Sequence, residues 1–583
     1  MRYVFGEMGL LACAIVFLAA VAASQDAKIP GSGGGTRGDH ACVLAGRITS
    51  MRTGTPVSRA TIELSTVDSA MDAYADFQWG QLSISAGGLR AQYSAMSDKV
   101  GDFCFGTVKA GRYRLSGRKH GYLETSYGAS TPTETGAIVD VHPQDHKELS
   151  FSLSPQGTIS GKVTDADGEP VDSGSVRAML RVWIRGAFRN VPVAGGRPND
   201  LGEFRLANLA PGTYYVVFQP ASANSPTANQ KGEESNAPQV VRTFYPAATL
   251  FTLAVPIRVG VGSDVQDVDI HAQKIPTHRL RGKVLGDRRE ADFGAISISP
   301  EDEDATSLVA GGGGVRRDHT FEFAGLPPGS YKVTYLVVSG GTHNVSREVF
   351  QVGDKDVDDA VLSVTPPVSV RGRVRFEGAD QPNLSDVQLQ LISIDALVAP
   401  NFSANVQPDG AFVIEDVSAG KYLVHFRVPS GSYLKSARFG LADIADKLFD
   451  VPGGGGEMEI VLRSGAAEVN GTIEAPQGSA APSVVSGYFL LVPDDLAPDG
   501  SGVRFGGADA NGEFSVKDLR PGHYRAYAFA SLDPSAVQDP NVLRAIEPFA
   551  TGIDLEENGK ATVALRVIPP DQAASAFSVS RIP

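Results

Sequence analysis

A pattern of one phenylalanine, one glycine and one tyrosine recurs five times along the chain, and this repeat constrains the fold more than any other feature. In every copy the glycine follows the phenylalanine by eight residues and the tyrosine follows it by ten. The copies run from Phe103 to Tyr113, Phe204 to Tyr214, Phe321 to Tyr331, Phe412 to Tyr422 and Phe514 to Tyr524. The residue two after the phenylalanine is always apolar, so both side chains share one face of a strand, and the glycine marks a turn. Each copy therefore predicts a β-hairpin with one buried face.

A second motif precedes each hairpin, namely a glycine two residues before an aliphatic side chain. Its copies begin at Gly46, Gly161, Gly282, Gly372 and Gly471. Successive phenylalanines are 101, 117, 91 and 102 residues apart, which is too long for a propeller blade and suits one β-sandwich with its own core. With 65 Gly and 36 Pro among 583 residues, many turns and few long helices are expected. The predicted fold class is all-β, a tandem array of about five Ig-like or transthyretin-like β-sandwich domains after a signal peptide.

The repeat also predicts how the chain is divided. We expect a signal peptide (1–24), a flexible linker (25–40), five modules (41–154 with an insertion at 66–97, 155–275, 276–365, 366–464 and 465–570) and a tail (571–583). Short helices are expected only near Leu441–Leu448 and Asn541–Ile546. The linkers between modules are very short, so the array should be semi-rigid.

The N-terminus has the pattern of a secretory signal. Arg2 is followed by an apolar run from Leu10 to Ala23, and small residues suggest cleavage near Ala22–Ser24. The run is too short for a comfortable membrane span, and no second apolar stretch reaches that length. Leu10–Cys13 resembles a lipoprotein box, but the apolar run continues past Cys13. We therefore expect an exported chain, periplasmic, cell-surface or extracellular, with no membrane span in its mature form.

Two cysteines, Cys42 and Cys104, remain after the signal. In an exported protein they are candidates for a disulfide that closes a loop of about 60 residues, worth about 4 kcal/mol in the chain-entropy model. Phe103 and Phe105 should face the core, which turns Cys104 outward. Two unpaired thiols remain the alternative.

The motifs resemble the carboxypeptidase regulatory-like domain, a transthyretin-like sandwich of the carbohydrate-binding-like fold group. The resemblance rests on Gly161-Lys162-Val163, on the turn Asp165–Val171 and on Gly202–Tyr214, and module one carries a similar opening at Gly54–Ile62. It covers nearly all of the mature chain, although modules three and four lack the Asp-Gly-Glu-Pro turn. It implies a passive module without catalytic residues, found in large exported bacterial proteins and sometimes associated with glycan binding.

Catalytic, metal and nucleic-acid functions find little support. The net charge of −14 disfavours nucleic acid. His319 and Glu322 form a His-x-x-Glu motif, but residues three apart on a strand face opposite ways and cannot share a zinc ion. His142, Asp145 and His146 could offer three metal ligands from one loop, but we favour a solvated turn as their explanation. We predict no enzyme activity, no cofactor and no metal site.

The candidate ligand site is an aromatic-rich segment in the insertion of module one. Tyr74, Phe77 and Trp79 lie close together there, with Tyr93 nearby, and exposed aromatic faces are what sugars bind. The alternative is a loop that folds back onto its own sandwich. The function predicted is a non-enzymatic binding and scaffold protein with a polysaccharide or glycan as ligand. The alternative is a structural spacer or a module that docks an envelope protein, and a spacer should be elongated.

Overall fold

The computed structural model describes residues 42–579, apart from 68–90, 143–144, 185–186, 222–237, 287–292, 302–310, 314, 340–341, 379–381, 395–401, 477–484, 486, 498–499, 501 and 535. Its elements are β-strands with a few short helices, and the strands pair into small sheets that lie two to a sandwich. The predicted all-β tandem array is confirmed.

The first sandwich packs the sheet β4-β1-β8, with β9 also on β1, against the sheet β3-β2-β5-β6, with β7 also on β5. Its strands are β1 (Leu44–Ser50), β2 (Thr61–Thr66), β3 (Ala91–Met96), β4 (Asp102–Phe105), β5 (Gly111–Arg118), β6 (Thr125–Ser126), β7 (Ile138–Val141), β8 (Lys147–Glu148) and β9 (Phe151–Leu153).

The second sandwich packs β13-β10-β18, with β19 on β10, against β12-β11-β14-β16, with β17 on β14. Its elements are β10 (Gly157–Thr164), β11 (Gly174–Ile184), β12 (Ala187–Gly196), β13 (Glu203–Leu209), β14 (Gly212–Pro220), β15 (Pro238–Val240), β16 (Thr243–Phe244), η2 (Phe251–Leu253), β17 (Ile257–Val259), β18 (Asp264–Val265), β19 (Ile270–His271) and β20 (Lys274–Pro276). Strands β15 and β20 pair with each other at its boundary with the third sandwich.

The third sandwich packs β24-β21-β27 against β23-β22-β25-β26, and the fourth packs β31-β28-β36-β33-β34 against β30-β29-β32-β35. The third comprises β21 (His278–Leu285), β22 (Phe293–Pro300), β23 (Gly311–Gly313), β24 (Thr320–Leu326), β25 (Gly329–Ser339), β26 (Thr342–Val352) and β27 (Val357–Ser363). The fourth comprises β28 (Val368–Glu377), η3 (Leu384–Asp386), β29 (Gln388–Ser393), β30 (Phe402–Asn405), β31 (Ala411–Val417), β32 (Gly420–Arg427), β33 (Ser432–Phe439), β34 (Ala442–Asp443), β35 (Phe449–Val451) and β36 (Gly456–Ser464).

The fifth sandwich packs β40-β37-β43 against β39-β38-β41-β42 and adds two α-helices. Its elements are β37 (Ala467–Glu474), β38 (Tyr488–Pro493), β39 (Arg504–Gly507), β40 (Glu513–Leu519), β41 (Gly522–Phe529), α2 (Pro540–Ile546), η4 (Glu547–Phe549), β42 (Thr551–Leu555), β43 (Lys560–Arg566) and α3 (Pro570–Val579).

The motif glycine and the motif phenylalanine face each other across one antiparallel strand pair in all five sandwiches. The aligned pairs are Gly46 with Phe103, Gly161 with Phe204, Gly282 with Phe321, Gly372 with Phe412 and Gly471 with Phe514. A Cβ atom added at any of these glycines would lie between 1.7 and 2.9 Å from a carbonyl oxygen of the segment that runs parallel beside it. The glycine is therefore needed because the neighbouring backbone approaches too closely for a side chain.

The motif tyrosine makes the same hydrogen bond in every sandwich. Its hydroxyl donates to the carbonyl four residues earlier, at 2.6–2.9 Å, in Tyr113, Tyr214, Tyr331, Tyr422 and Tyr524. All five side chains are buried. The hydroxyl thus satisfies a carbonyl in the turn before the return strand, which explains why tyrosine rather than phenylalanine recurs there.

The residue two before the motif phenylalanine has a left-handed backbone in all five sandwiches. Four of them are glycines with φ between 71° and 85°, namely Gly101, Gly202, Gly410 and Gly512. His319 replaces the glycine in the third sandwich and keeps the same conformation, with φ at 63°. Its carbonyl also accepts the same cross-strand hydrogen bond, from Val284 N–H at 2.9 Å.

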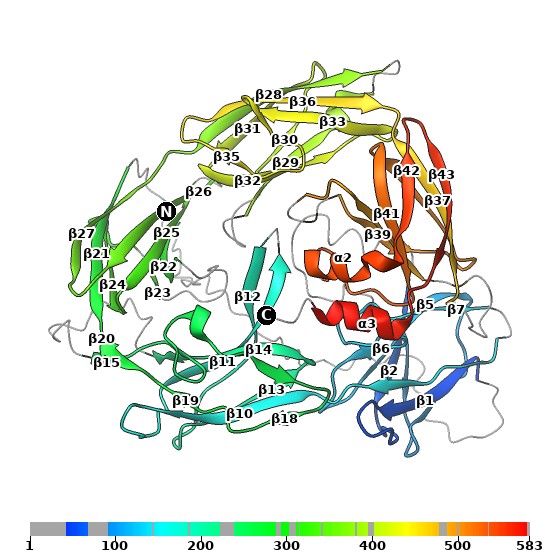
Figure 1. Ribbon diagram of the computed structural model, residues 1–583, viewed down its shortest axis with the longest axis horizontal. Helices are drawn as coiled ribbons and strands as arrows, with labels where there is room; N and C mark the ends of the chain where they lie inside the picture. Colours follow the sequence, from blue (N-terminus) through cyan, green and yellow to red (C-terminus); the bar gives the residue numbers. More distant parts are fainter. Residues whose placement is uncertain are drawn as a thin grey trace, which may run out of the picture.

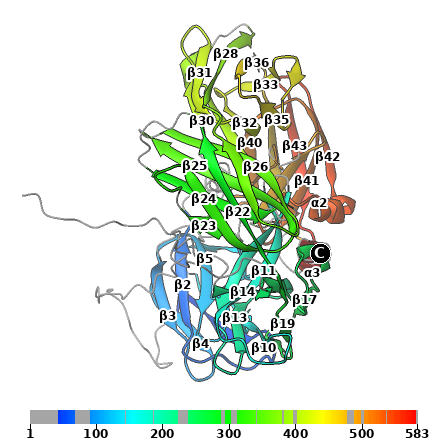
Figure 2. The same ribbon diagram turned by 90° about the vertical axis from the view of Figure 1, so that its left-hand side faces the viewer.

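The five sandwiches follow one another around a closed ring, so that the first lies against the fifth (Figure 1). From the side, the third sandwich faces the viewer, with the first and second below it and the fourth above (Figure 2). A direct hydrogen bond, from Thr135 N–H to the Leu532 carbonyl at 2.8 Å, joins the two ends of the array. The ring differs from the elongated shape expected of a spacer. Contacts between residues almost 400 positions apart decide it, and a repeat pattern carries no information about them.

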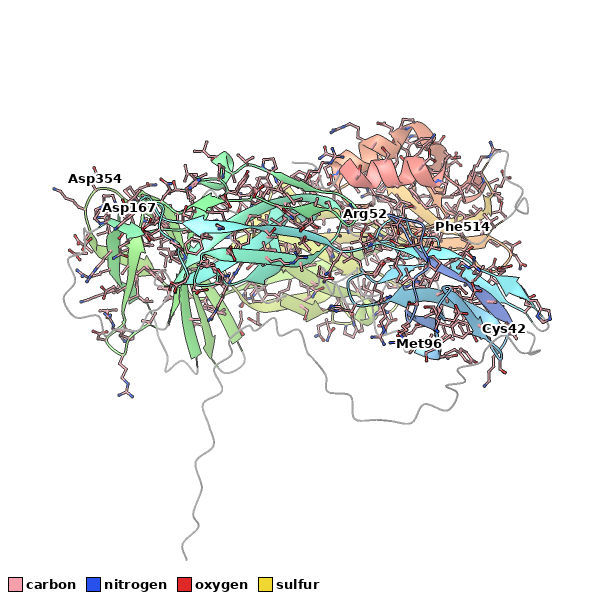
Figure 3. The ribbon with its side chains drawn as sticks, turned by 90° about the horizontal axis from the view of Figure 1, so that it is seen from below. Cys42, Arg52, Met96, Asp167, Asp354 and Phe514 are labelled. Atoms are coloured by element: carbon pink, nitrogen blue, oxygen red, sulfur yellow. A yellow bond between two sulfur atoms is a disulfide. The ribbon has the colours of Figure 1, made fainter. Side chains whose placement is uncertain are left out.

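The two helices cover the outer face of one sheet of the fifth sandwich. A second apolar cluster forms there between the sheet and the helices, and Phe577 and Ile546 are among its fully buried members. Figure 3 shows both helices on one face of the ring, next to the sandwich that carries Phe514. This second layer explains why every residue of β38 is buried.

Local differences from the sequence predictions have simple causes. The helix predicted near Asn541–Ile546 is present as α2, but Leu441–Leu448 forms the short strand β34 and turns instead. The segment expected to be a tail contains α3. Its Ala573, Ala576 and Phe577 are buried, and their spacing of three and four residues is the helical signal that could have revealed it. Residues Ala91–Met96 of the predicted insertion form β3, paired with β2.

Candidate functional site

The predicted aromatic site is only partly within the described residues. Tyr74, Phe77 and Trp79 lie outside them. Tyr93 lies on β3, half-buried, with its ring edge-on to Tyr113 at 6.0 Å between centroids. Its hydroxyl accepts a hydrogen bond from Lys109 N–H at 3.3 Å. Tyr93 thus packs against the core of the first sandwich.

Cys42 and Cys104 are joined by a disulfide, with their Cα atoms 5.7 Å apart. Phe103 and Phe105 are buried and Cys104 is exposed between them, as the alternation of side chains along β4 requires. The bridge fastens the start of the described chain to β4 on the outside of the first sandwich. In Figure 3, Cys42 lies at the edge of this sandwich, away from the helices.

The most extensive feature that the sequence did not predict is the contact between the first and fifth sandwiches. This contact closes the ring, and we call it the seam. It joins Arg112, Arg114 and residues 133–138 of the first sandwich to Tyr488, Ala508 and residues 531–533 of the fifth. Its polar contacts are Thr135 N–H to Leu532 O (2.8 Å), Leu532 N–H to Thr135 Oγ1 (3.2 Å), Gly136 N–H to Ser531 Oγ (3.0 Å), Thr133 Oγ1 to Asp533 Oδ2 (2.6 Å), Arg114 Nη2 to Tyr488 Oη (3.2 Å) and Arg112 Nη2 to Ala508 O. Ile138 packs against the apolar cluster under the helices.

Two acidic side chains from opposite sides are buried at the seam. Glu134 is 7% exposed and Asp533 is 1% exposed. Glu134 Oε2 accepts a hydrogen bond from Ser130 N–H at 3.1 Å, whereas its Oε1 is buried without a hydrogen-bond partner. Burial raises the pKa of Glu134 above its usual range, and the charge of Asp533 adds to the rise. The Ser130 N–H and the side chains of Ser531 and Thr131 partly oppose it, because they hydrogen-bond to the charged carboxylate.

A long hairpin, β11–β12, extends from the second sandwich into the middle of the ring (Figure 1). Arg189 on β12 is buried and donates through Nη2 to the carbonyl of Ile394, at the end of β29 in the fourth sandwich. Trp183 and Phe188 meet edge to face with centroids 4.9 Å apart, and the Arg181 guanidinium lies 4.8 Å from the Phe188 ring centre. The hairpin therefore connects sandwiches that are not neighbours in the chain.

The junction of the fourth and fifth sandwiches is built around Glu557. Its carboxylate accepts a hydrogen bond from the Tyr433 hydroxyl at 2.6 Å and pairs with Arg463 Nε at 2.7 Å. Burial and then the bond to Glu557 raise the pKa of Tyr433 to about 12. Asp518 braces the same junction by accepting the Gly431 N–H.

Sequence reasoning missed the residues of the seam and of the hairpin contact. The seam partners are between 374 and 400 positions apart, and none is one of the recurring Phe, Gly or Tyr residues. Within the described part of the chain, no group of three or more His, Cys, Asp or Glu side chains is placed to hold a metal ion. Nor does any helix there have the length and apolar character needed to cross a membrane.

Comparisons with known proteins give distant matches only. No protein-family model matches the chain, and no curated protein does. Among solved structures, a minor pilin of Streptococcus agalactiae is 13% identical, with 40% of this chain and 96% of that chain covered and a TM-score of 0.21. Two B repeat units of the collagen-binding protein of Staphylococcus aureus are 10% identical, with 71% and 100% covered and a TM-score of 0.15. TM-scores this low carry no argument about the fold or function of this chain.

Proposed function

We propose that this chain is an exported, non-enzymatic scaffold and binding protein whose five sandwiches form one braced platform. The observation that carries the proposal is the seam. Relative motion is the usual behaviour of domains joined by small contacts, but here the first and last sandwiches are tied by several hydrogen bonds and by the packing of Ile138. No sandwich can then rotate without breaking a junction, so the exposed loops keep fixed positions.

The repeated residues support a structural role. In all five sandwiches the glycine admits a neighbouring backbone, the phenylalanine fills the core and the tyrosine satisfies a turn carbonyl. Catalysis requires polar groups that converge on one reacting position. The features that recur from sandwich to sandwich are instead occupied in holding the fold.

Two observations support export. The apolar run from Leu10 to Ala23 has the length and the flanking residues of a secretory signal. The Cys42–Cys104 disulfide is of the kind that persists in oxidising compartments. The site of action we propose is the cell envelope or the space outside the cell.

The ring favours a docking platform over a spacer. A spacer separates its two ends, whereas the first and fifth sandwiches of this chain lie side by side. For the ligand, we propose a polysaccharide or glycan bound at the aromatic segment of Tyr74, Phe77 and Trp79. An envelope protein docked on the ring is the second candidate, favoured by the fixed relative positions of the sandwiches.

Fluorescence of a single tryptophan tests whether a glycan binds at the aromatic segment. The chain has only two tryptophans, so the variant Trp183→Phe leaves Trp79 as its sole tryptophan. We expect a glycan found on an array with residues 25–583 to quench this emission, and Trp79→Ala to abolish binding. Binding that survives Trp79→Ala would place the glycan elsewhere, and absence of binding by a folded chain would reject the glycan and leave the protein partner.

Small-angle X-ray scattering tests the platform itself. A braced ring predicts a scattering curve that agrees with the closed arrangement of the five sandwiches and a maximum dimension close to the diameter of the ring. An extended, flexible row of sandwiches would give a much larger maximum dimension and would reject the platform.

A further inference from the structure

We propose that the seam is an acid-stabilised latch, in which protonation of Glu134 favours the closed ring and ionisation of Glu134 weakens it. This regulation goes beyond the scaffold role. It would hold for the ring whichever ligand or partner the ring carries.

The seam is the junction at which the ring can open. The other junctions join sandwiches that follow one another along the chain, so a covalent linker holds each pair together. The seam joins residues such as Arg114 and Tyr488, which are 374 positions apart. It can therefore separate without breaking a linker, and both of its faces then become accessible to water.

Glu134 lies at the centre of this contact. Its two neighbours, Thr133 and Thr135, both make hydrogen bonds across the seam, to Asp533 and Leu532. The side chain is buried in the closed ring, and its Oε1 has no hydrogen-bond partner. The Ser130 N–H and the side chains of Ser531 and Thr131 favour the charged form, but burial is the larger effect. A buried carboxylate with an unsatisfied oxygen is costly, and protonation of the carboxyl removes most of that cost.

The charged groups around Glu134 do not compensate its ionised form. Glu134 makes no ion pair within the described structure, and the charge that acts on it from the fifth sandwich is the like charge of Asp533. The two arginines of the seam are directed elsewhere. Arg112 Nε lies 3.5 Å from Asp140 Oδ1, and Arg112 Nη2 donates to the Ala508 carbonyl. Arg114 donates to the Tyr488 hydroxyl.

The direction of the pH effect follows from these contacts. In the closed ring the pKa of Glu134 is above its ordinary value of 4.5. In the open ring we expect it to return towards that value, because water then reaches the carboxyl. The closed ring therefore binds the proton more tightly. Closure is strongest below about pH 4.5 and weakens as the pH rises through the raised pKa. In total, the opening constant should rise about tenfold for each pH unit by which the pKa of Glu134 in the closed ring exceeds its pKa in the open ring.

Hydrogen exchange at the seam measures the opening constant directly. The amides of Thr135, Gly136 and Leu532 make hydrogen bonds across the seam, so their exchange, corrected for the intrinsic pH dependence, reports opening. In the wild-type chain we expect the opening constant to rise as the pH increases from 4 to 8. In Glu134→Gln, a neutral variant of the same shape, it should stay low and lose this pH dependence.

Glu124→Gln is the matched control, because Glu124 is an exposed glutamate of the same sandwich. It should behave as the wild type. Peptides from β25 in the third sandwich, far from the seam, should show no pH-dependent opening. If they open together with the seam, global unfolding explains the effect and the latch is rejected.

A second variant keeps the proposal testable if Glu134→Gln fails to fold. Asp533→Asn removes the neighbouring charge, and it should reduce the pH dependence without abolishing it, since burial is the larger cause. A wild-type seam whose opening does not change with pH would overturn the proposal. It would also be overturned if the opening constant of Glu134→Gln, or that of Asp533→Asn, kept the full pH dependence of the wild type.

Discussion

Alanine at the motif glycine of the fourth sandwich should destabilise that sandwich selectively. In Gly372→Ala the added Cβ would lie 2.3 Å from the Met458 carbonyl oxygen and 2.4 Å from Phe412 Cζ. The phenylalanine ring can tilt, but the carbonyl belongs to β36, which is paired with β28 along its length. The two strands must therefore move apart for the methyl group to fit.

The size of the effect follows from two opposing terms. Forcing a methyl group into a packed site costs about 1–3 kcal/mol, and a clash with backbone puts this site near about 3. Alanine also restricts the unfolded chain and returns about 0.4–1 kcal/mol. We expect a net loss of about 2 kcal/mol, which corresponds to roughly 30-fold more frequent opening.

Native-state hydrogen exchange of peptides from β28 and β36 is the appropriate assay, because a chain of five sandwiches does not unfold in one two-state step. Gly454→Ala is the matched control in the same sandwich. A Cβ there meets nothing within 4 Å, so this variant should be neutral or slightly more stable. Unchanged exchange in Gly372→Ala, or an equal increase in both variants, would refute the close-approach explanation of the motif.

Three further changes test other parts of the fold. Tyr422→Phe removes the hydroxyl that donates to the buried Ser418 carbonyl at 2.7 Å, and should cost about 1–3 kcal/mol, measured by exchange in β32. Replacing Cys42 and Cys104 together by serine opens a loop with a sequence separation of 62 and should cost about 4 kcal/mol in the first sandwich, measured by hydrogen exchange in β1. His319→Gly should stabilise the third sandwich by about 0.5–1 kcal/mol. A non-glycine residue with a left-handed backbone costs about 1–2 kcal/mol, and the greater freedom of glycine in the unfolded chain offsets about half of that gain.

Each of these has a clear opposite outcome. A Tyr422→Phe chain with wild-type exchange would show that water replaces the hydroxyl. A double serine variant as stable as the wild type would mean that the bridge constrains nothing that unfolds. A less stable His319→Gly variant would show that the imidazole makes contacts worth more than the backbone strain it imposes.

The sequence by itself was enough to determine the repeating unit. The fixed spacing from Phe412 to Tyr422, and its four equivalents, predicts a hairpin because strand side chains alternate and glycine permits a turn. The same alternation turned Cys104 outward, where the structure places its disulfide with Cys42. These are local rules, and the same local chemistry was available in every copy.

Close approach between segments gave the motif glycines a meaning that the sequence did not show. Gly372 could have been a turn or a flexible point. Only the structure shows a carbonyl of a parallel segment and an aromatic ring converging on it. The parallel segment lies far along the chain, so no short pattern records the contact.

Tertiary structure alone decided that the array closes. Thr135 and Leu532 carry no motif, and their hydrogen bond depends on the summed orientation of every sandwich between them. Small changes in the angle at each junction accumulate around the ring, so repeat spacing cannot say whether the ends meet. Nothing in the sequence around Glu134 distinguishes it from an ordinary surface glutamate, whereas in the closed ring it is buried beside the fifth sandwich.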